Sequence, residues 1–201
     1  MSVKRKGKSI LARIRTEVYV AVLLFILFVF LLITVLRTPK IDLARFGHYE
    51  RKLRCEPVPV CADSDGKTYE DYRMITDPTS MQYQLIQNEL KVDSKTGLLY
   101  DKDGFLAVAL GYAFGEIGSR YYMTLDTGIV LPLIKADEKD PKDASDGCKV
   151  DINGTVIEFV LDSDLALEYF GTISNGLILD GNLNNSLYLQ GKIVKIEKVF
   201  N

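Results

Sequence analysis

The chain has 201 residues, with 25 basic and 27 acidic side chains, and its formal net charge at neutral pH is −2. This length allows one hydrophobic segment and one domain of modest size. The charge balance excludes the basic surface that nucleic-acid binding requires, so we expect no nucleic-acid partner. Glycine-rich nucleotide-binding motifs are absent, and the one histidine, His48, cannot build a His-rich zinc site. We therefore expect neither a metal ion nor another cofactor.

An uncharged apolar run, residues 18–36, follows a basic segment, residues 1–17. About 20 apolar residues in a helix cross the hydrocarbon layer of a bilayer. The run does not end in the small residues of a signal-peptide cleavage site, so it predicts an uncleaved transmembrane signal anchor. Basic residues concentrate before the run, which predicts a single-pass cell-membrane protein with a cytoplasmic N-terminus and an extracytoplasmic C-terminal domain.

The segment after the apolar run is acidic. Residues 38–201 keep 18 of the 25 basic and 26 of the 27 acidic side chains, which leaves a charge of about −8. Residues 37–78 contain four prolines and are expected to form an extended juxtamembrane linker. Residues 79–201 are expected to form an extracytoplasmic β-barrel domain.

The elements expected in that domain are mostly strands. Turn residues separate β-rich runs, and helical spacing of apolar residues follows Thr79 and Ser163, which can cap helices. In chain order we expect a helix from 79, a hairpin over 98–110, strands at 121–125, 129–134 and 155–161, a helix over 165–170 and a strand at 192–200.

The three cysteines leave the disulfide pattern open. Cys55 and Cys61 are six residues apart, so a small disulfide loop and a pair of free thiols are equal alternatives. In either case Cys148 has no predicted partner.

The missing histidines restrict any catalysis to carboxyl groups, as in glycan cleavage or aspartic proteolysis. The triplet Asp126-Thr127-Gly128 is the motif of aspartic proteases, which need two such triplets facing each other. This chain has one, so a protease would have to be a homodimer. A tight turn between two strands explains the same triplet, because Gly supplies a positive φ.

The order of segments after Gly118 resembles a known family. A strand opened by Gly118-Ser119-Arg120 leads through a turn and a second strand to an acidic loop, and Gly154-Thr155-Val156-Ile157-Glu158 follows. This order is similar to the double-psi β-barrel of rare lipoprotein A-like and three-aspartate cell-wall hydrolase domains. The text from Ala109 to Gly128 also resembles uncharacterised membrane-anchored proteins of Gram-positive bacteria and their mobile elements. The expected fold is thus mainly β: an N-terminal transmembrane helix, then a small six-stranded double-psi-like barrel with one or two short helices.

The resemblance implies a lytic cleavage of peptidoglycan. Asp137 falls at the position of the family's loop aspartate and would donate a proton to the glycosidic oxygen. Glu158, or Asp126 across the hairpin, would be the second acid. Tyr112 and Tyr122 are candidates for stacking on sugar faces.

The acidic loop is equally typical of a solvated loop without catalytic function. The first functional expectation is therefore a membrane-anchored cell-surface protein whose barrel binds the wall or an envelope protein without catalysis. The alternatives are a carboxylate-dependent lytic transglycosylase or glycan hydrolase on the same barrel, and a dimeric aspartic protease acting through Asp126.

Overall fold

The computed structural model divides the chain into two compact units, Met1–Thr38 and Pro39–Asn201. The basic segment up to residue 16 and His48 lie outside the part of the chain that the structure describes. The described residues are 17–33, 53–59, 61, 65–174, 177, 178, 183, 186 and 189–200.

The first unit contains a helix of residues 17–33 whose apolar side chains are exposed almost throughout. Residues 34–36 of the predicted membrane span lie outside the described residues. Among the described residues, no helix has both the length and the apolar character needed to cross a membrane. The transmembrane helix of the predicted fold is therefore not found in this part of the chain.

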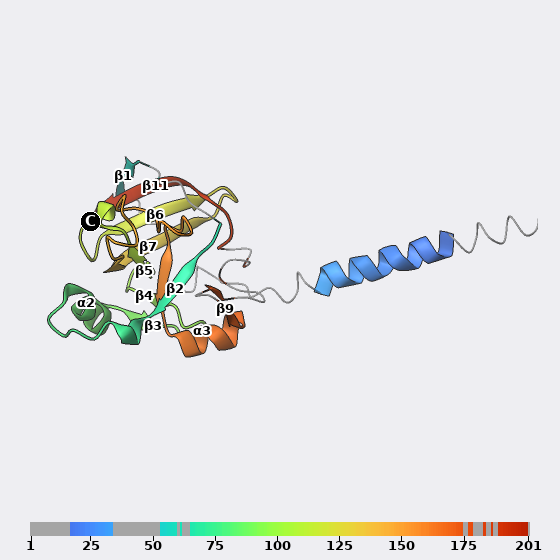
Figure 1. Ribbon diagram of the computed structural model, residues 1–201, viewed down its shortest axis with the longest axis horizontal. Coiled ribbons are helices and arrows are strands. Elements are labelled where there is room, and N and C mark those ends of the chain that lie inside the picture. The colour runs from blue at the N-terminus through green and yellow to red at the C-terminus, as the bar shows by residue number, and fades with distance from the viewer. Residues whose placement is uncertain are drawn as a thin grey trace, which may run out of the picture. The chain divides into compact units, whose positions relative to one another are not determined.

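The second unit is built on one open, mixed sheet of nine strands (Figure 1). The strand order along its main path is β1-β11-β6-β7-β5-β4-β3, and β8 pairs with both β5 and β2. Two pairings are parallel, β2 with β8 and β5 with β7, and the others are antiparallel. The strands are β1 (Arg54–Val58), β2 (Thr68–Asp71), β3 (Lys91–Val92), β4 (Leu99–Tyr100), β5 (Leu106–Leu110), β6 (Arg120–Leu125), β7 (Val130–Glu138), β8 (Glu158–Leu161) and β11 (Ile193–Phe200).

The predicted mainly-β, six-stranded double-psi-like barrel is therefore wrong. The sheet is open because its path ends at β1 on one edge and at β3 on the other. Two of the additional strands come from the segment expected to be a linker: β1 pairs along β11, and β2 pairs along β8. Together with its helices, this sheet makes the domain mixed α/β.

The strands that alternate in sequence follow the prediction closely. Strand β6 buries Tyr121, Met123 and Leu125, and the residues between them are half-buried. The turn after Leu125 leads into β7, so the predicted hairpin is confirmed. Strand β5 is instead buried along its whole length, because it has neighbours on both edges and a core cluster on each face.

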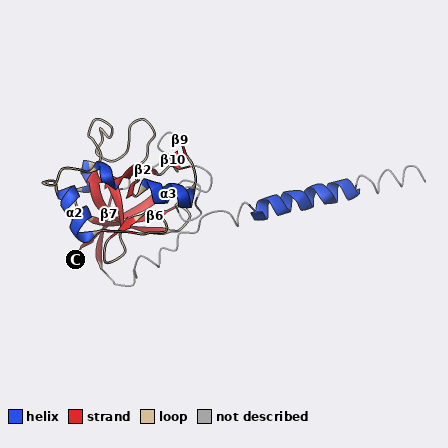
Figure 2. Cartoon of the chain, turned by 90° about the horizontal axis from the view of Figure 1, so that it is seen from below, coloured by secondary structure: helices blue, strands red, loops and turns tan. Residues whose placement is uncertain are grey.

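Helices cover the two faces of the sheet (Figure 2). Helix α2 (Met81–Glu89) adds Leu85 and Ile86 to one core cluster, and helix α3 (Ser163–Phe170) adds Ala166 and Phe170 to the other. Both helices were expected, with caps displaced by one or two residues. The remaining elements are the 3-10 helices η2 (Tyr72–Met74) and η3 (Tyr112–Phe114) and the short pair β9 (Ile173–Ser174) with β10 (Leu177–Ile178).

The N-termini of these helices are capped by side chains. Ser80 precedes α2, and its Oγ accepts a hydrogen bond from the backbone N–H of Tyr83 at 3.1 Å. Asp162 precedes α3, and its carboxylate accepts from the N–H groups of Asp164 and Leu165. Each cap satisfies N–H groups that have no partner inside the helix.

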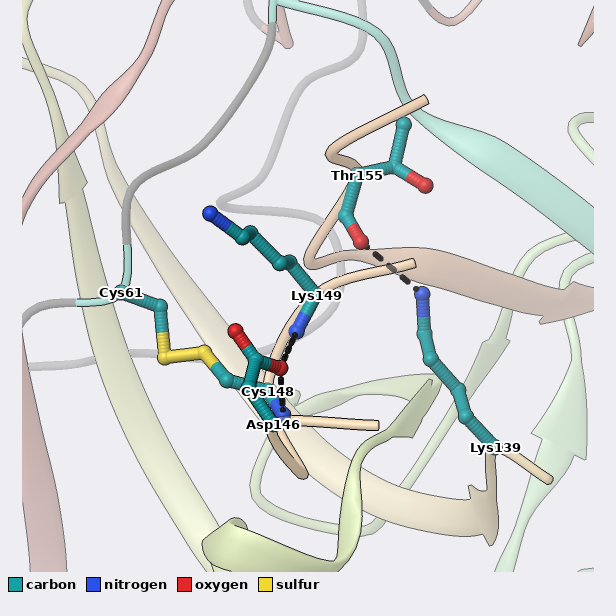
Figure 3. The surroundings of a disulfide bond; sticks show 6 residues. All are labelled: Cys61, Lys139, Asp146, Cys148, Lys149 and Thr155. Atoms are coloured by element: carbon teal, nitrogen blue, oxygen red, sulfur yellow. Dashed lines mark hydrogen bonds between the residues drawn. A yellow bond between two sulfur atoms is a disulfide. The ribbon is translucent and has the colours of Figure 1, made fainter. Parts of the chain in front are cut away.

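A disulfide bond joins Cys61 to Cys148, and Cys55 is free (Figure 3). The Cα atoms of the two bonded residues are 6.3 Å apart. The bond ties the segment before β2 to the long loop that follows β7. The Cys55–Cys61 pairing considered from the sequence is therefore not formed, and Cys148 supplies the partner instead.

We expect loss of this disulfide to destabilise the domain. The bond closes a loop across 87 positions of sequence, and the loss of chain entropy in the unfolded state for a loop of this size stabilises a fold by about 4 kcal/mol. Urea unfolding should show a decrease of about that size for Cys61→Ser. Cys55→Ser is the matched control and should unfold like the wild type; equal stabilities for all three proteins would contradict the pairing.

Candidate functional site

The second unit contains an open cavity of about 570 Å³. Its floor comes from strands β2, β5, β7 and β8, and its wall comes from the loop of residues 139–153. Most of the lining side chains are charged, and acidic residues outnumber basic ones. The residues on which the chemistry depends are Glu70, Asp137, Lys139, Asp143 and Glu158.

Strand register brings three carboxyl groups together in this cavity. Ala109 of β5 pairs with Asp137 on β7 and with Glu158 on β8. On the other side of β8, Glu158 pairs with Thr68 of β2, and Glu70 lies two residues further along the same face. Segments distant in sequence thus place Glu70, Asp137 and Glu158 on one surface.

Glu70 is the most perturbed acid of the three. Burial, followed by the negative charges of Asp137 and Glu158 and a hydrogen bond to Asp137, raises the pKa of Glu70 to about 9; the Lys139 ammonium opposes this shift. Its Oε1 atom is buried without a hydrogen-bond partner among the described residues. Glu70 therefore holds a proton at neutral pH and donates it to the Asp137 carboxylate.

Glu158 is the second perturbed acid of the cavity. Burial, the largest effect, and the nearby charges of Asp137 and Asp143 raise its pKa above the ordinary value, although the Lys139 ammonium and a hydrogen bond from Thr68 oppose this shift. Neighbouring carboxyl groups with perturbed pKa values are an arrangement that acid–base catalysis uses.

The C-terminal end of β2, just after Glu70, is anchored to helix α3. Asp71 accepts hydrogen bonds from the N–H of Ser163 at 3.1 Å and from its hydroxyl at 2.5 Å. Arg73 pairs with Asp71 at 2.5 Å and with Asp164 at 2.7 Å. These bonds hold the pKa of Asp71 well below its usual range, with Arg73 the main cause. They fix β2, and with it the position of Glu70.

The wall of the cavity is held by local bonds and by the disulfide. The Ser145 hydroxyl donates to Asp151 at 3.0 Å, and the backbone N–H of Cys148 donates to Asp146 at 2.8 Å. The Cys61–Cys148 bond then connects this wall to the segment that leads into β2. One covalent bond therefore connects the segment before β2, the strand that carries Glu70, to the loop that forms the cavity wall.

Of the residues proposed from the sequence, the structure brings two together. Asp137 and Glu158 both line the cavity. Asp126 does not: it lies in the β6–β7 turn, where its Oδ1 accepts from the N–H of Lys192 at 3.1 Å. Gly128 in that turn has φ of 84°, as the turn interpretation of the triplet requires.

The two tyrosines proposed to bind sugars lie outside the cavity lining. Tyr112 is 48% exposed on η3, and its hydroxyl donates to the backbone oxygen of Ser145 at 3.2 Å. The half-buried ring of Tyr122 packs on Phe105, with ring centroids 5.3 Å apart. Both side chains therefore have structural contacts in this fold.

Glu70 was not predicted from the sequence. It falls in the segment expected to be a linker, and the four residues of β2 carry only one apolar side chain that faces a core, Tyr69. The available signal was an aromatic at Tyr69 and another at Tyr72, which indicates packing against the domain but not a site.

Comparison with models of protein families, with curated proteins and with solved structures found no match. Within the described ranges, no group of three His, Cys, Asp or Glu side chains is arranged to hold a metal ion.

We expect the protonation of Glu70 to make stability depend on pH. The folded-state pKa, about 9, lies above the ordinary value of a glutamate, so the contribution of Glu70 to stability is complete at acidic pH and is lost as pH rises toward 9. Glu70→Gln removes this titration. Urea unfolding at pH 5 should give similar stabilities for wild type and variant, and at pH 8 the variant should be the more stable protein. Parallel pH profiles would show that Glu70 titrates normally.

Proposed function

We propose that residues 39–201 form an extracytoplasmic domain that cleaves a cell-wall glycan by acid catalysis, with Glu70 as the proton donor. The observation that carries this proposal is the protonated Glu70 carboxyl beside Asp137 and Glu158 in an open cavity. Enzymes that cleave glycosidic bonds need an acid that keeps its proton at neutral pH next to carboxylates that stabilise positive charge.

The disulfide supports a location outside the cytoplasm, because structural disulfides persist mainly in oxidising compartments. Attachment of the N-terminal segment to the cell membrane stays a prediction from the sequence.

The proposed reaction starts with transfer of the Glu70 proton to the glycosidic oxygen as the bond from that oxygen to the anomeric carbon breaks. Asp137 and Glu158, as carboxylates, stabilise the positive charge that develops on the sugar ring. The 6-hydroxyl of the same sugar, or a water molecule, then attacks the anomeric carbon and gives its proton to the Glu70 carboxylate. Glu70 is thereby restored, and the products are an anhydro sugar in the first case and a reducing sugar in the second.

In this mechanism the roles of the acids differ from those implied by the family resemblance. The resemblance made Asp137 the proton donor. In the mechanism proposed here Glu70 holds the proton, because its pKa is raised to about 9, and Asp137 is its hydrogen-bond partner. Asp137 and Glu158 thus become the candidates for charge stabilisation.

Binding without cleavage is the second candidate, and one observation favours it. No aromatic side chain lines the cavity among the described residues, so it lacks the stacking surface on which many sugar-binding sites depend. The same polar cavity would then bind a polar wall component or a partner protein of the envelope.

We expect the full-length protein to release soluble muropeptides from purified peptidoglycan, and Glu70→Gln to reduce the rate by about 100-fold or more, because general acid catalysis contributes factors of this size. Chromatography with mass spectrometry measures the release and separates anhydro from reducing products. Release by the wild type should also fall as pH rises through about 9, where Glu70 loses its proton.

Glu116→Gln is the matched control, because Glu116 is an exposed glutamate outside the cavity lining. It should leave the rate unchanged. Release of muropeptides by Glu70→Gln at the wild-type rate would contradict the proposed mechanism. Absence of release by the wild type, together with co-sedimentation of the protein with the wall, would instead support binding without cleavage.

A further inference from the structure

We propose that Lys139 is a positioning residue of this reaction: its buried ammonium group, which reaches from the end of β7 toward β8, holds the Glu158 carboxylate charged and in place beside Glu70. The inference rests on the proposed function. It concerns a residue that the mechanism above does not use and that belongs to the cavity wall.

The backbone places Lys139 at the junction of the catalytic strands. It follows directly after β7, two residues beyond Asp137, and its N–H donates to the backbone oxygen of Leu110 at the end of β5 at 3.1 Å. Its side chain then reaches toward β8, where Nζ donates to the backbone oxygen of Thr155 at 3.3 Å (Figure 3). The side chain is 5% exposed.

The hydrogen bond to the backbone oxygen of Thr155 does not by itself explain why the Lys139 ammonium group is buried. The Thr155 oxygen already accepts a hydrogen bond from the N–H of Val150 at 2.9 Å. Burying an ammonium group costs several kcal/mol unless negative charge lies near it. The cavity supplies that charge, so the carboxylates account for the lysine better than the carbonyl does.

Charged groups from each element around the cavity line it together with Lys139. Glu70 comes from β2, Asp137 from β7, Glu158 from β8 and Asp143 from the loop, and the rest of the lining adds Glu138, Asp140, Lys142 and Asp151. The Lys139 charge lowers the pKa of Glu158, second only to the opposing effect of burial. For Glu70 it is the last and smallest influence. Lys139 therefore acts more on the charge-stabilising acid than on the proton donor.

Removal of the Lys139 charge should therefore act through Glu158. We expect Lys139→Met to move the titration of the Glu158 carboxyl to higher pH. Because cleavage needs Glu158 as a carboxylate, the acid limb of the pH–rate profile should move the same way. The ratio of the wild-type rate to the variant rate should be about tenfold larger at pH 5 than at pH 8.

The measurement is carbon-13 NMR titration of the glutamate carboxyl groups in the full-length protein, with Glu70→Gln and Glu158→Gln used for assignment. Lys139→Arg keeps the charge and should restore the wild-type titration of Glu158 and the wild-type acid limb. Lys102→Met removes a charge from an exposed lysine in the turn before β5 and should change neither. Lys139→Gln is a second neutral variant that retains a hydrogen-bond donor.

The outcomes separate this inference from the proposed function. If Glu70 titrates in the ordinary range of glutamate in the wild type, the proposed function fails first. The second outcome is a raised pKa for Glu70 with a Lys139→Met variant that keeps the wild-type titration of Glu158 and the wild-type acid limb of the pH–rate profile. In that case only the role of Lys139 is overturned. Failure of both neutral variants to fold would also overturn it, because Lys139 would then be a structural residue.

Discussion

The hydrogen bond between the Glu70 and Asp137 carboxyl groups is the interaction on which the candidate site depends. Two carboxylates at hydrogen-bond distance repel each other, so the arrangement persists only with a proton between them. The fold enforces it: Ala109 on β5 aligns Asp137 with Glu158, and β2 pairs in parallel along β8 to add Glu70. Any register shift by one residue would turn these side chains to the opposite face.

The same constraint explains why so much of the domain holds β2 in place. Among the described strands β2 pairs only with β8, and its own four residues are all half-buried. Its position is therefore secured at both ends, by the Cys61–Cys148 bond before it and by the bonds of Asp71 to Ser163 after it. A strand that carries the proton donor would otherwise be the least stable part of the site.

Local structure could be predicted from the sequence far better than the arrangement of strands. Alternation of apolar residues predicted the β6–β7 hairpin and β11, and capping residues predicted both helices, because these signals act over a few residues. The residues Asp137 and Glu158 were selected through a family resemblance, and the structure places them in one cavity. Glu70, the open sheet edges and the Cys61–Cys148 pair could not be predicted. Each depends on contacts between segments that are distant in sequence, and β1 and β2 have little apolar periodicity of their own.

The charge distribution of the cavity differs between its rim and its floor. Acids that serve only for solubility gain most from full exposure to water, and several acids of the loop are indeed exposed. Glu70, Asp137 and Glu158 are instead partly buried around a buried lysine, where each charge loses hydration. Natural proteins retain such costly groups mainly where their chemistry is used. A solvated loop thus accounts for the rim of this cavity, whereas function is the better explanation of its floor.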